Sequence, residues 1–474
     1  MVDVLREAAL DSPGAESLDD GGRQWTFAEL DAAASRMARR LAPLGAGPGA
    51  TLALVAHPGP LAVQAVFAAS RLGATVAPLN VGLRPPEFEA AFDALGPDMI
   101  LATRRARDAA GLDPVWVTPL DDLPKPEGEG GGEGGDRASP EPFAILWTSG
   151  TEGRPHGVCL SSRAFEAVGA ASRTALQSGP GARWYASLSL GHVGGLATVL
   201  RSIGHRATLV TRGRFDAKEL ASLVDRGSVT HASLVPTMLE RLLGAREGRA
   251  APPSLKCLLV GGAHAPSSLV ARALELGYPL ALTYGMTETT SQVATAPPSL
   301  VRQKPGTVGR PLGGVEVRLT EGSEIHVRGP TVAVGYIGDP SPLVDEQGWY
   351  ATGDLGRMDE DGHLWITGRC SGRLVTGGVN VDPVEVEEAL RRVAGVADAC
   401  VVGLDDAEWG DLVSALIVPD QMAPPDITDV KNRLEAWLSP PKIPRLIRIA
   451  AELPRQLNGK VDRLAVRTLL KGQR

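Results

Sequence analysis

Apolar segments of strand length alternate with helical patterns along the first hundred residues. The apolar runs cover residues 51–57 (TLALVAH), 74–80 (ATVAPLN) and 98–103 (DMILAT). Between them, residues 60–73 and 85–96 place apolar side chains three or four positions apart, which is the spacing of one helix face. Strands that alternate with helices predict a parallel sheet covered by helices.

The same alternation returns between residues 184 and 285, but the pattern then changes twice. From residue 322 short segments are separated by glycine, which is typical of antiparallel sheet. After about residue 372 a helical pattern, PVEVEEALRRV, is followed by the strands ACVVGLD and SALIVP and by a further helix and strand. We therefore predict an α/β fold with two domains. Residues 1–370 form a large N-terminal domain of mixed and parallel sheets with covering helices and a β-subdomain, and residues 371–474 form a small α+β domain.

Composition agrees with a globular protein of more than one domain. The chain has 474 residues, of which 43% are hydrophobic and 22% charged. It has no run of 18 apolar residues and its first residues include acids, so we expect a cytoplasmic protein without a membrane span or signal peptide. Residues 125–139, KPEGEGGGEGGDRAS, are expected to form a flexible surface insertion. The four cysteines are far apart and are expected to be free thiols: Cys159, Cys257, Cys370 and Cys400.

The charge is unevenly distributed. The chain carries a net −7, yet residues 431–474 contain eleven Lys or Arg and only three Asp or Glu. Aromatic residues are not interleaved with the basic ones in this segment, as they are on nucleic-acid surfaces, so we expect no nucleic-acid partner. A solvated basic face and a site for an anionic ligand both remain open.

A loop rich in hydroxyls and glycine, TSGTEGRPHGV at residues 148–158, follows the apolar strand AILW. Its hydroxyls and its glycine amides suit an anion such as a phosphate. No Gly-Lys-Ser/Thr follows at the spacing of a Walker loop, so the pattern is compatible equally with an ordinary polar loop.

Four further segments carry candidate chemistry. TYGMTETT at residues 283–290 ends a strand, where α/β sheets bind ligands, and its Glu288 is a hard oxygen ligand for Mg²⁺. Asp354 lies in the glycine-bounded YATGDLG, Arg369 precedes the last domain, and Lys460 follows Asn-Gly in a tight turn. Taken alone, each of these segments is also compatible with a simple turn.

The order and spacing of these segments resemble the adenylate-forming superfamily of acyl-CoA synthetases, peptide-synthetase adenylation domains and luciferases. The resemblance covers residues 25–463, nearly the whole chain. Within this superfamily, SLGHVGGLATVLRSI, LKCLLVGGAHAPSSLV and TYGMTETTSQVAT are most similar to the o-succinylbenzoate–CoA ligases of menaquinone synthesis.

The resemblance implies a reaction in two halves that uses ATP, Mg²⁺ and coenzyme A. A carboxylate attacks the α-phosphate of ATP to give an acyl-adenylate, and coenzyme A then displaces AMP. The resemblance also implies the following roles: Thr148, Ser149, Gly150, Thr151 and Gly153 for the β- and γ-phosphates; Gly262, Ala263, Tyr284 and Gly285 for adenine; Thr287 for the α-phosphate; Glu288 for Mg²⁺; Asp354 and Arg369 for ribose; and His192 in the catalytic group.

Further roles follow from the same resemblance. Lys460 bridges the acyl carboxylate and the α-phosphate, and a hinge near residues 371–373 then exchanges it for the coenzyme A loop of Thr376, Gly377 and Gly378. Since o-succinylbenzoate has two carboxylates, we assign the second to Arg201, with a solvated helix Arg as the alternative. Lys431, Lys442 and Arg445 are candidates for the coenzyme A phosphates.

The chain departs from the superfamily pattern at three places. Glu152 replaces a threonine and His156 a lysine in the phosphate loop, and Ser371-Gly372 replaces the usual Asp-Asp of the hinge. The alternatives are therefore another acyl- or aryl-CoA synthetase, a stand-alone enzyme that loads a carrier protein, and a non-catalytic adenylate-binding protein. The expected partners are a small carboxylic acid and coenzyme A, and the sequence leaves a homodimer open.

Overall fold

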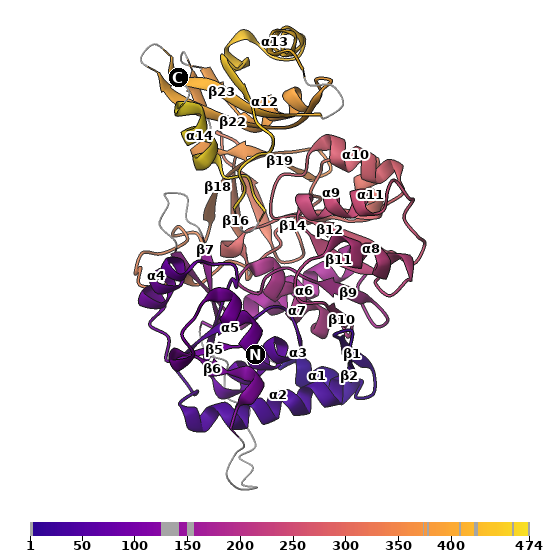
Figure 1. The fold of residues 1–474 in the computed structure, drawn as a ribbon, viewed down its shortest axis with the longest axis vertical. Helices are drawn as coiled ribbons and strands as arrows, with labels where there is room; N and C mark the ends of the chain where they lie inside the picture. The colour runs from indigo at the N-terminus through magenta and orange to yellow at the C-terminus, as the bar shows by residue number, and fades with distance from the viewer. Residues whose placement is uncertain are drawn as a thin grey trace. The chain divides into compact units, whose positions relative to one another are not determined.

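The chain divides into two compact units. A computed structural model describes residues 3–124, 142–148, 156–372, 374–376, 379–406, 409–420, 425–456 and 459–472 (Figure 1). The first unit comprises Met1–His264, Arg272–Val317 and Val327–Tyr350, and the second comprises Ala265–Ala271, Arg318–His326 and Ala351–Arg474. Both units contain sheets and helices, so the predicted α/β class is confirmed.

The first sheet of the first unit contains the strands predicted near the N-terminus. Its order within the described residues is β17-β8-β7-β4-β3-β5-β6. The central strands β7, β4, β3 and β5 pair in parallel, whereas β8 pairs antiparallel with β7. The strands are β3 (Thr51–Val55), β4 (Thr75–Leu79), β5 (Met99–Ala102), β6 (Thr118–Pro119), β7 (Ala144–Thr148), β8 (His156–Leu160) and β17 (Gly335–Tyr336).

The second sheet of the first unit has the order β14-β13-β12-β11-β9-β10-β1-β2 among the described strands. The pairs from β13 through β1 are parallel, and the two outer strands are antiparallel. The strands are β1 (Glu16–Asp19), β2 (Gln24–Thr26), β9 (Arg183–Ala186), β10 (Thr208–Thr211), β11 (His231–Leu234), β12 (Cys257–Val260), β13 (Leu280–Tyr284) and β14 (Ala294–Ala296).

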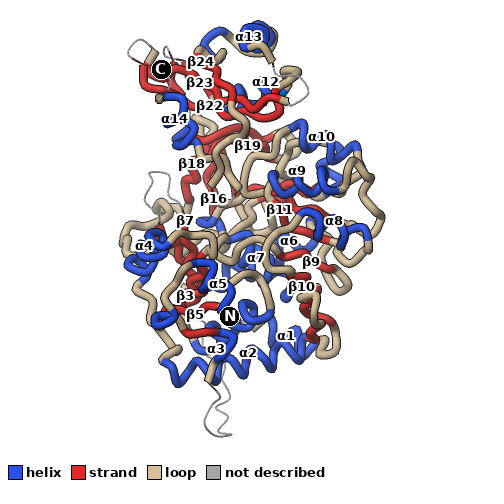
Figure 2. Tube along the Cα trace, viewed as in Figure 1, coloured by secondary structure: helices blue, strands red, loops and turns tan. Residues whose placement is uncertain are grey.

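Helices accompany these strands throughout (Figure 2). One buried core joins side chains of α2, α3 and α7 to those of β4, β7 and β10, so both sheets contribute to it. The helices are α1 (Val4–Asp11), α2 (Phe27–Leu41), α3 (Pro60–Leu72), α4 (Pro85–Leu95), α5 (Arg104–Ala110), α6 (Ser162–Ala175), α7 (Val193–Gly204), α8 (Ala217–Asp225), α9 (Pro236–Ala245), α10 (Ser267–Glu275) and α11 (Pro298–Gln303).

The antiparallel strands predicted after residue 322 form a sheet of order β15-β16-β18-β19 within the described chain. The last sheet has the order β21-β20-β23-β22, with β24 paired to β23, and α12 and α14 lie beside β22 (Figure 1). These elements are β15 (Glu316–Leu319), β16 (Glu324–Arg328), β18 (Tyr350–Met358), β19 (Leu364–Arg369), β20 (Leu374–Thr376), β21 (Val379–Val381), β22 (Val396–Asp406), β23 (Gly410–Pro419), β24 (Leu446–Ile449), α12 (Pro383–Arg391), α13 (Ile427–Leu434) and α14 (Arg463–Lys471).

Local sequence explains where several helices start and stop. Thr26 and Glu29 form a capping box at the start of α2, and Gly73 ends α3 in a left-handed conformation. Every strand and helix predicted between residues 51 and 103 is present within two residues of its expected bounds. Helix α7 starts at Val193, and the preceding His192 has the extended backbone of an N-cap residue.

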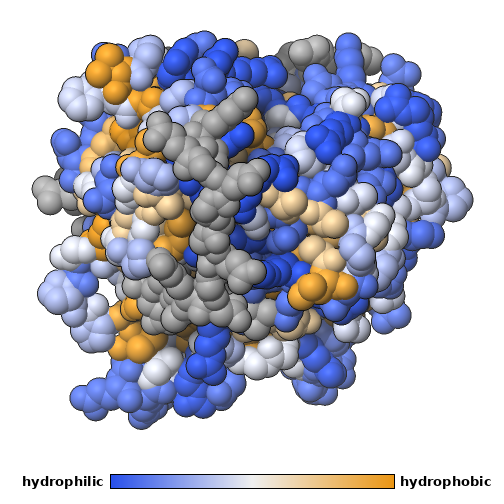
Figure 3. All heavy atoms as spheres, turned by 90° about the horizontal axis from the view of Figure 1, so that it is seen from below, coloured by the Kyte–Doolittle hydropathy of each residue, from blue (hydrophilic) through white to orange (hydrophobic). Residues whose placement is uncertain are grey.

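The structure also describes the four cysteines and the length of each helix. All four cysteines are free thiols. No helix within the described ranges combines the length and apolar character needed to cross a bilayer. The face shown in Figure 3 is mainly hydrophilic, with apolar side chains scattered across the part that grey atoms do not cover.

Candidate active site

The phosphate loop begins at the carboxyl edge of the first sheet. Thr148 is the last residue of β7, and it pairs with His156, the first residue of β8, across the antiparallel register. The Thr148 hydroxyl donates a 3.3 Å hydrogen bond to the His156 carbonyl, so both ends of the loop are fixed side by side. The other candidate phosphate residues lie outside the described residues: Ser149, Gly150, Thr151 and Gly153, together with the unusual Glu152.

His156 stands where the superfamily has a lysine, and its side chain is exposed. Its ring centroid lies 5.7 Å from that of Tyr336. The nearby Asp339 has a lowered pKa, chiefly because its carboxylate accepts from the Ser341 backbone, with the charge of His156 contributing. His156 is therefore exposed to solvent and has an acidic neighbour, Asp339.

The candidate adenine residues follow two adjacent strands of the second sheet. Gly262 and Ala263 are exposed just after β12, and Gly262 has the left-handed φ of +77°. Tyr284 is buried at the end of β13, and Gly285 follows it. A Cβ on Gly285 would lie 1.4 Å from the carbonyl oxygen of Ser291, so only glycine fits this turn.

The candidate magnesium ligand is held by a tyrosine from a different strand. Thr287 and Glu288 lie in a short 3₁₀ helix directly after this turn. Tyr336 of β17 donates a 3.3 Å hydrogen bond from its Oη to Glu288 Oε1. Burial raises the pKa of Tyr336 to about 12, and burial also raises the pKa of Tyr350, so both hydroxyls stay protonated beside the carboxylate.

Helix α7 carries both His192 and Arg201. His192 is the N-cap residue, and Arg201 lies in the last turn of the helix. The predicted alternative of a solvated Arg201 is wrong, because this side chain is only 5% exposed. Residues 195–203 of α7 are all buried, so this part of the helix has no solvent-exposed face that could hold a cation.

The partners of Arg201 are neutral. Its guanidinium donates to Gln292 Oε1 at 2.9 Å, Thr198 Oγ1 at 3.1 Å and Ser233 Oγ at 3.0 Å, while its Nε has no hydrogen-bond partner in the described structure. It also lies over the Trp184 ring, 4.8 Å from the centroid. No carboxylate of the described chain pairs with it, which is unusual for a buried cation.

The remaining titratable groups near Arg201 add no charge. Burial, together with the positive charge of Arg201, lowers the pKa of His205 and of His231 to about 4. Burial raises the pKa of Cys257 to about 12. Burial also lowers the pKa of Arg201 itself to about 10, yet it remains charged at neutral pH. The region is therefore a buried positive charge that lacks a counter-ion.

A narrow pocket lies beside the residues that bind this charge. It is lined by Thr198 and Ser233, the two hydroxyl residues that bind the guanidinium. The rest of its wall comes from the ends of β3 and β9 and the first half of α7: Pro58, Ala186, Ser187, Leu188, Gly195 and Val199.

The candidate ribose residues form a cross-strand pair within the second unit. Asp354 of β18 lies opposite Arg369 of β19, and their Oδ1 and Nε atoms are 2.6 Å apart. The Asp354 side chain is 10% exposed and that of Arg369 is 50% exposed. The carboxylate is thus oriented by a guanidinium that remains accessible from solvent.

Lys460 also belongs to the second unit, where its side chain is exposed. Its carbonyl accepts from the Gln456 backbone at 2.8 Å, so the lysine stands at a narrow turn as predicted. Thr376 is buried at the end of β20, whereas Gly377 and Gly378 and hinge residue 373 lie outside the described residues.

The three basic candidates for coenzyme A have partners within the second unit. Lys431 donates to the Arg445 carbonyl at 2.8 Å, Lys442 pairs with Glu385 at 2.7 Å, and the Arg445 guanidinium lies 3.6 Å from the centroid of the Trp409 ring. These contacts explain the positions of the three side chains without a bound coenzyme A. We therefore assign no coenzyme A contact to them.

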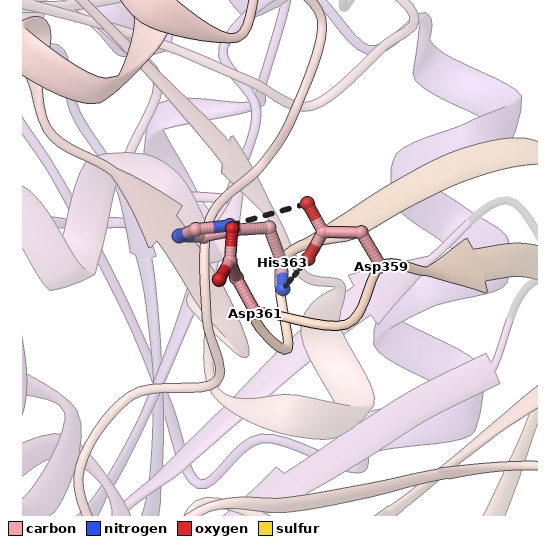
Figure 4. A group of neighbouring side chains, drawn as sticks. All are labelled: Asp359, Asp361 and His363. Atoms are coloured by element: carbon pink, nitrogen blue, oxygen red, sulfur yellow. Dashed lines mark hydrogen bonds and ion pairs between the residues drawn. The ribbon is translucent and has the colours of Figure 1, made fainter.

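Asp359, Asp361 and His363 form a further group with atoms suited to a metal (Figure 4). The three residues lie on the turn between β18 and β19. One Asp359 oxygen accepts from the His363 backbone at 2.8 Å and the other lies 3.4 Å from His363 Nδ1. Asp361 is 61% exposed. The closure of a tight turn explains this arrangement.

Comparison with known families identifies the chain. The model of AMP-binding enzymes matches residues 5–337, and the model of the AMP-binding enzyme C-terminal domain matches residues 385–460. The chain belongs to the AMP-binding enzyme family.

Two relatives in the family are similar over nearly their whole length. The 2-succinylbenzoate–CoA ligase of Bacillus licheniformis is 33% identical over 473 residues, covering 97% of this chain and 98% of the relative. The 2-succinylbenzoate–CoA ligase of Bacillus subtilis is 32% identical over 470 residues, covering 94% of each.

Two solved structures are similar in fold over the full chain. The o-succinylbenzoate CoA synthetase of Bacillus subtilis, in complex with an acyl-adenylate intermediate, has a TM-score of 0.86 and 29% identity, covering 98% of this chain and 97% of that one. The ATP-bound MatB of Rhodopseudomonas palustris has a TM-score of 0.89 and 26% identity, covering 99% of each chain. The fold alone therefore does not select the acid.

Sequence reasoning missed four residues that the structure places beside the candidate site. Gln292 and Ser233 hold Arg201, Tyr336 holds Glu288, and Asn80 lies 3.2 Å from His192. Only Asn80 had a usable signal, because it directly follows an apolar strand and thus stands at the ligand-binding edge of a parallel sheet. The other three contact residues far away in sequence.

Proposed function

We propose that this chain is an ATP-dependent 2-succinylbenzoate–CoA ligase of menaquinone biosynthesis. It activates its acid as an acyl-adenylate and then forms the coenzyme A thioester, in the cytoplasm and without nucleic acid. The observation that carries the choice of acid is Arg201, a buried cation with neutral partners beside a pocket. Full-length similarity to two 2-succinylbenzoate–CoA ligases supports the same choice.

In this proposal Arg201 binds the carboxylate of the substrate that is not activated. A buried guanidinium is stabilised strongly by a carboxylate, because the two form paired, charge-assisted hydrogen bonds. The hydroxyls of Thr198 and Ser233 line the pocket and orient the guanidinium at the same time. A dicarboxylate would therefore supply the counter-ion that the described chain does not.

The first half-reaction needs positioning and charge neutralisation more than a protein nucleophile. Thr148 and the loop after it hold the β- and γ-phosphates, Tyr284 and Gly285 line the adenine, and Asp354 holds the ribose. Thr287 touches the α-phosphate. Lys460 neutralises the charge that develops between the attacking carboxylate and this phosphate.

The residues present fit a magnesium ion that arrives with ATP. Mg²⁺ is held in such sites by one or two carboxylates together with substrate phosphates. Glu288 supplies one half-buried carboxylate, and Tyr336 donates a 3.3 Å hydrogen bond to one of its oxygens, Oε1. When bound, the ion would neutralise phosphate charge during transfer.

The second half-reaction uses the small domain, which we propose comprises residues 371–474. Rotation at residues 371–373 removes Lys460 and brings the loop of Thr376, Gly377 and Gly378 to the pantetheine arm. Residues 1–370 keep the adenylate bound meanwhile. Two-state hinge motion of this kind lets one site perform two reactions in turn.

The runner-up is another acyl- or aryl-CoA synthetase, because the matching family models describe AMP-binding enzymes without naming an acid. The deciding assay is ATP-dependent thioester formation over a panel of fatty, aromatic and dicarboxylic acids, with and without coenzyme A. We expect o-succinylbenzoate to give the highest kcat/KM. Strong turnover of fatty acids with none of o-succinylbenzoate would refute the proposal. Transfer to a carrier protein but not to coenzyme A would favour a carrier-loading enzyme.

A further inference from the structure

Asn80 and His192 are 112 residues apart in sequence and meet through their side chains. Asn80 directly follows β4, and His192 directly precedes α7. Asn80 Nδ2 lies 3.2 Å from His192 Nε2, and both residues are half-buried. The contact therefore joins the carboxyl edge of the first sheet to the helix that carries Arg201.

A second hydrogen bond fixes which end of the Asn80 amide faces the ring. Asn80 Oδ1 accepts from the Gly82 backbone N–H at 3.0 Å, which is an Asx-turn. Since a backbone N–H can only donate, the oxygen of the amide must face Gly82. The NH₂ group, which can only donate, then faces His192.

This orientation determines the role of His192 Nε2. A donor that faces a ring nitrogen requires a lone pair on that nitrogen, so Nε2 accepts and the ring proton lies on Nδ1. The imidazolium form, in which both nitrogens carry hydrogen, would place two donors face to face. Asn80 therefore favours a neutral His192 with its proton on Nδ1.

Glycines next to His192 allow the backbone to pack closely around the pair. A Cβ on Gly191 would lie 2.6 Å from the backbone nitrogen of Asn80 and 2.8 Å from the Leu79 carbonyl carbon. A Cβ on Gly195 would lie 2.1 Å from the carbonyl oxygen of Ser189. Gly191 therefore lets the segment before α7 pack directly against the end of β4, and Gly195 lets the first turn of α7 pack against Ser189.

Asn80 also lies level with the start of the phosphate loop. In the parallel pair of β4 and β7, Val76 is opposite Ala144. Asn80 lies four residues beyond Val76, and Thr148 lies four residues beyond Ala144. Both residues thus stand at the edge where parallel sheets bind ligands.

We infer that Asn80 is a positioning residue for His192, which it holds neutral with Nε2 as acceptor and Nδ1 as donor. The importance of this for catalysis rests on the proposed function, in which His192 belongs to the catalytic group. Asn80 acts through the ring and touches no reacting atom. Nε2 of His192 is consequently not a proton donor to the substrate.

Nuclear magnetic resonance of protein labelled with ¹⁵N-histidine tests the pairing directly. The chain has 8 histidines, and loss of one ring signal in His192→Gln assigns the resonance. In the wild type at neutral pH we expect an unprotonated Nε2 and a protonated Nδ1. Asn80→Asp replaces the donor with an acceptor of the same shape and should move the proton onto Nε2. Asn432→Asp, the same change on an exposed residue of α13, is the matched control.

Kinetics separate a positioning role from a structural one. Loss of one such hydrogen bond should lower kcat by about tenfold in Asn80→Ala. In a His192→Gln background, Asn80→Ala should cause little further loss, because its partner is already absent. Additive losses, a wild-type Nε2 that carries the proton, or unchanged ring signals in Asn80→Asp would overturn the inference. If instead the enzyme proves inactive on o-succinylbenzoate, the ring signals still decide the Asn80 pairing, and only the proposed function fails.

Discussion

The buried charge of Arg201 allows the choice of substrate to be tested quantitatively. Arg201→Gln keeps a hydrogen-bonding side chain beside Gln292 and Ser233 but removes the positive charge. If Arg201 pairs with a substrate carboxylate, the variant should lose affinity for dicarboxylates specifically. If Arg201 serves only the fold, dicarboxylates and monocarboxylates should be affected alike.

The magnitude follows from the cost of burying this charge. The pKa of Arg201 falls from 12.5 to about 10, mainly through burial. At about 1.4 kcal/mol per pH unit, this is about 3 kcal/mol by which the charged form is penalised in the folded protein. A substrate carboxylate that pairs with Arg201 can offset up to about 3 kcal/mol of this penalty. That corresponds to about 100-fold in the affinity for the substrate.

The lowered pKa of Arg201 also predicts how the stability of the folded protein depends on pH. A base whose pKa is lowered on folding destabilises the protein below the folded pKa, and the penalty disappears only between about pH 10 and 12.5. The penalty is therefore constant from pH 6 to 9. The difference in stability between Arg201→Gln and the wild type should not change with pH over that range.

The assay compares kcat/KM for o-succinylbenzoate with that for 4-oxo-4-phenylbutanoate, which lacks one carboxylate. Arg201→Gln should lower the first by about 100-fold and the second by less than about threefold. Arg36→Gln, the same change at an exposed position of α2, is the control and should alter neither value. Equal losses for both acids, with a normal melting temperature, would refute the role of Arg201.

Three other changes probe the nucleotide side of the site. His156→Lys restores a full positive charge at the end of the phosphate loop, so the KM for ATP should fall with kcat nearly unchanged; a large fall in kcat would give the histidine another role. Tyr336→Phe removes the hydrogen bond to Glu288 and should change the Mg²⁺ concentration for half-maximal rate by about fivefold, measured by magnesium titration at fixed ATP. Lys460→Ala should abolish adenylate formation, measured by pyrophosphate exchange, while coenzyme A still attacks a supplied acyl-adenylate; equal loss of both half-reactions would contradict the two-conformation mechanism.

Much of the fold was accessible from local pattern. The alternation between residues 51 and 103 predicted β3, α3, β4, α4 and β5, because helices and strands impose different spacings on apolar positions. Local sequence also marks the start of α2, where Thr26 and Glu29 form a capping box. The relation between the sheets was beyond such patterns, since strand order depends on contacts distant in sequence.

The sequence by itself determined the family and the candidate residues for its chemistry. Hydroxyls, glycines and acids recur in short segments whose order is typical of the AMP-binding enzyme family, and each segment is readable without its neighbours in space. The continuous apolar stretch around Arg201 also indicated that this arginine is buried, because a helix that is apolar on all sides has no solvent-exposed face.

Only the tertiary structure decided how these side chains are held. Gln292 reaches Arg201 from 91 residues away, and Asn80 reaches His192 from 112 residues away. Hydrogen bonds of this kind depend on how separate strands and helices pack, and no local spacing encodes them. The neutral surroundings of Arg201 and the acceptor role of His192 Nε2 are properties of that packing, because burial and donor direction exist only once distant segments meet.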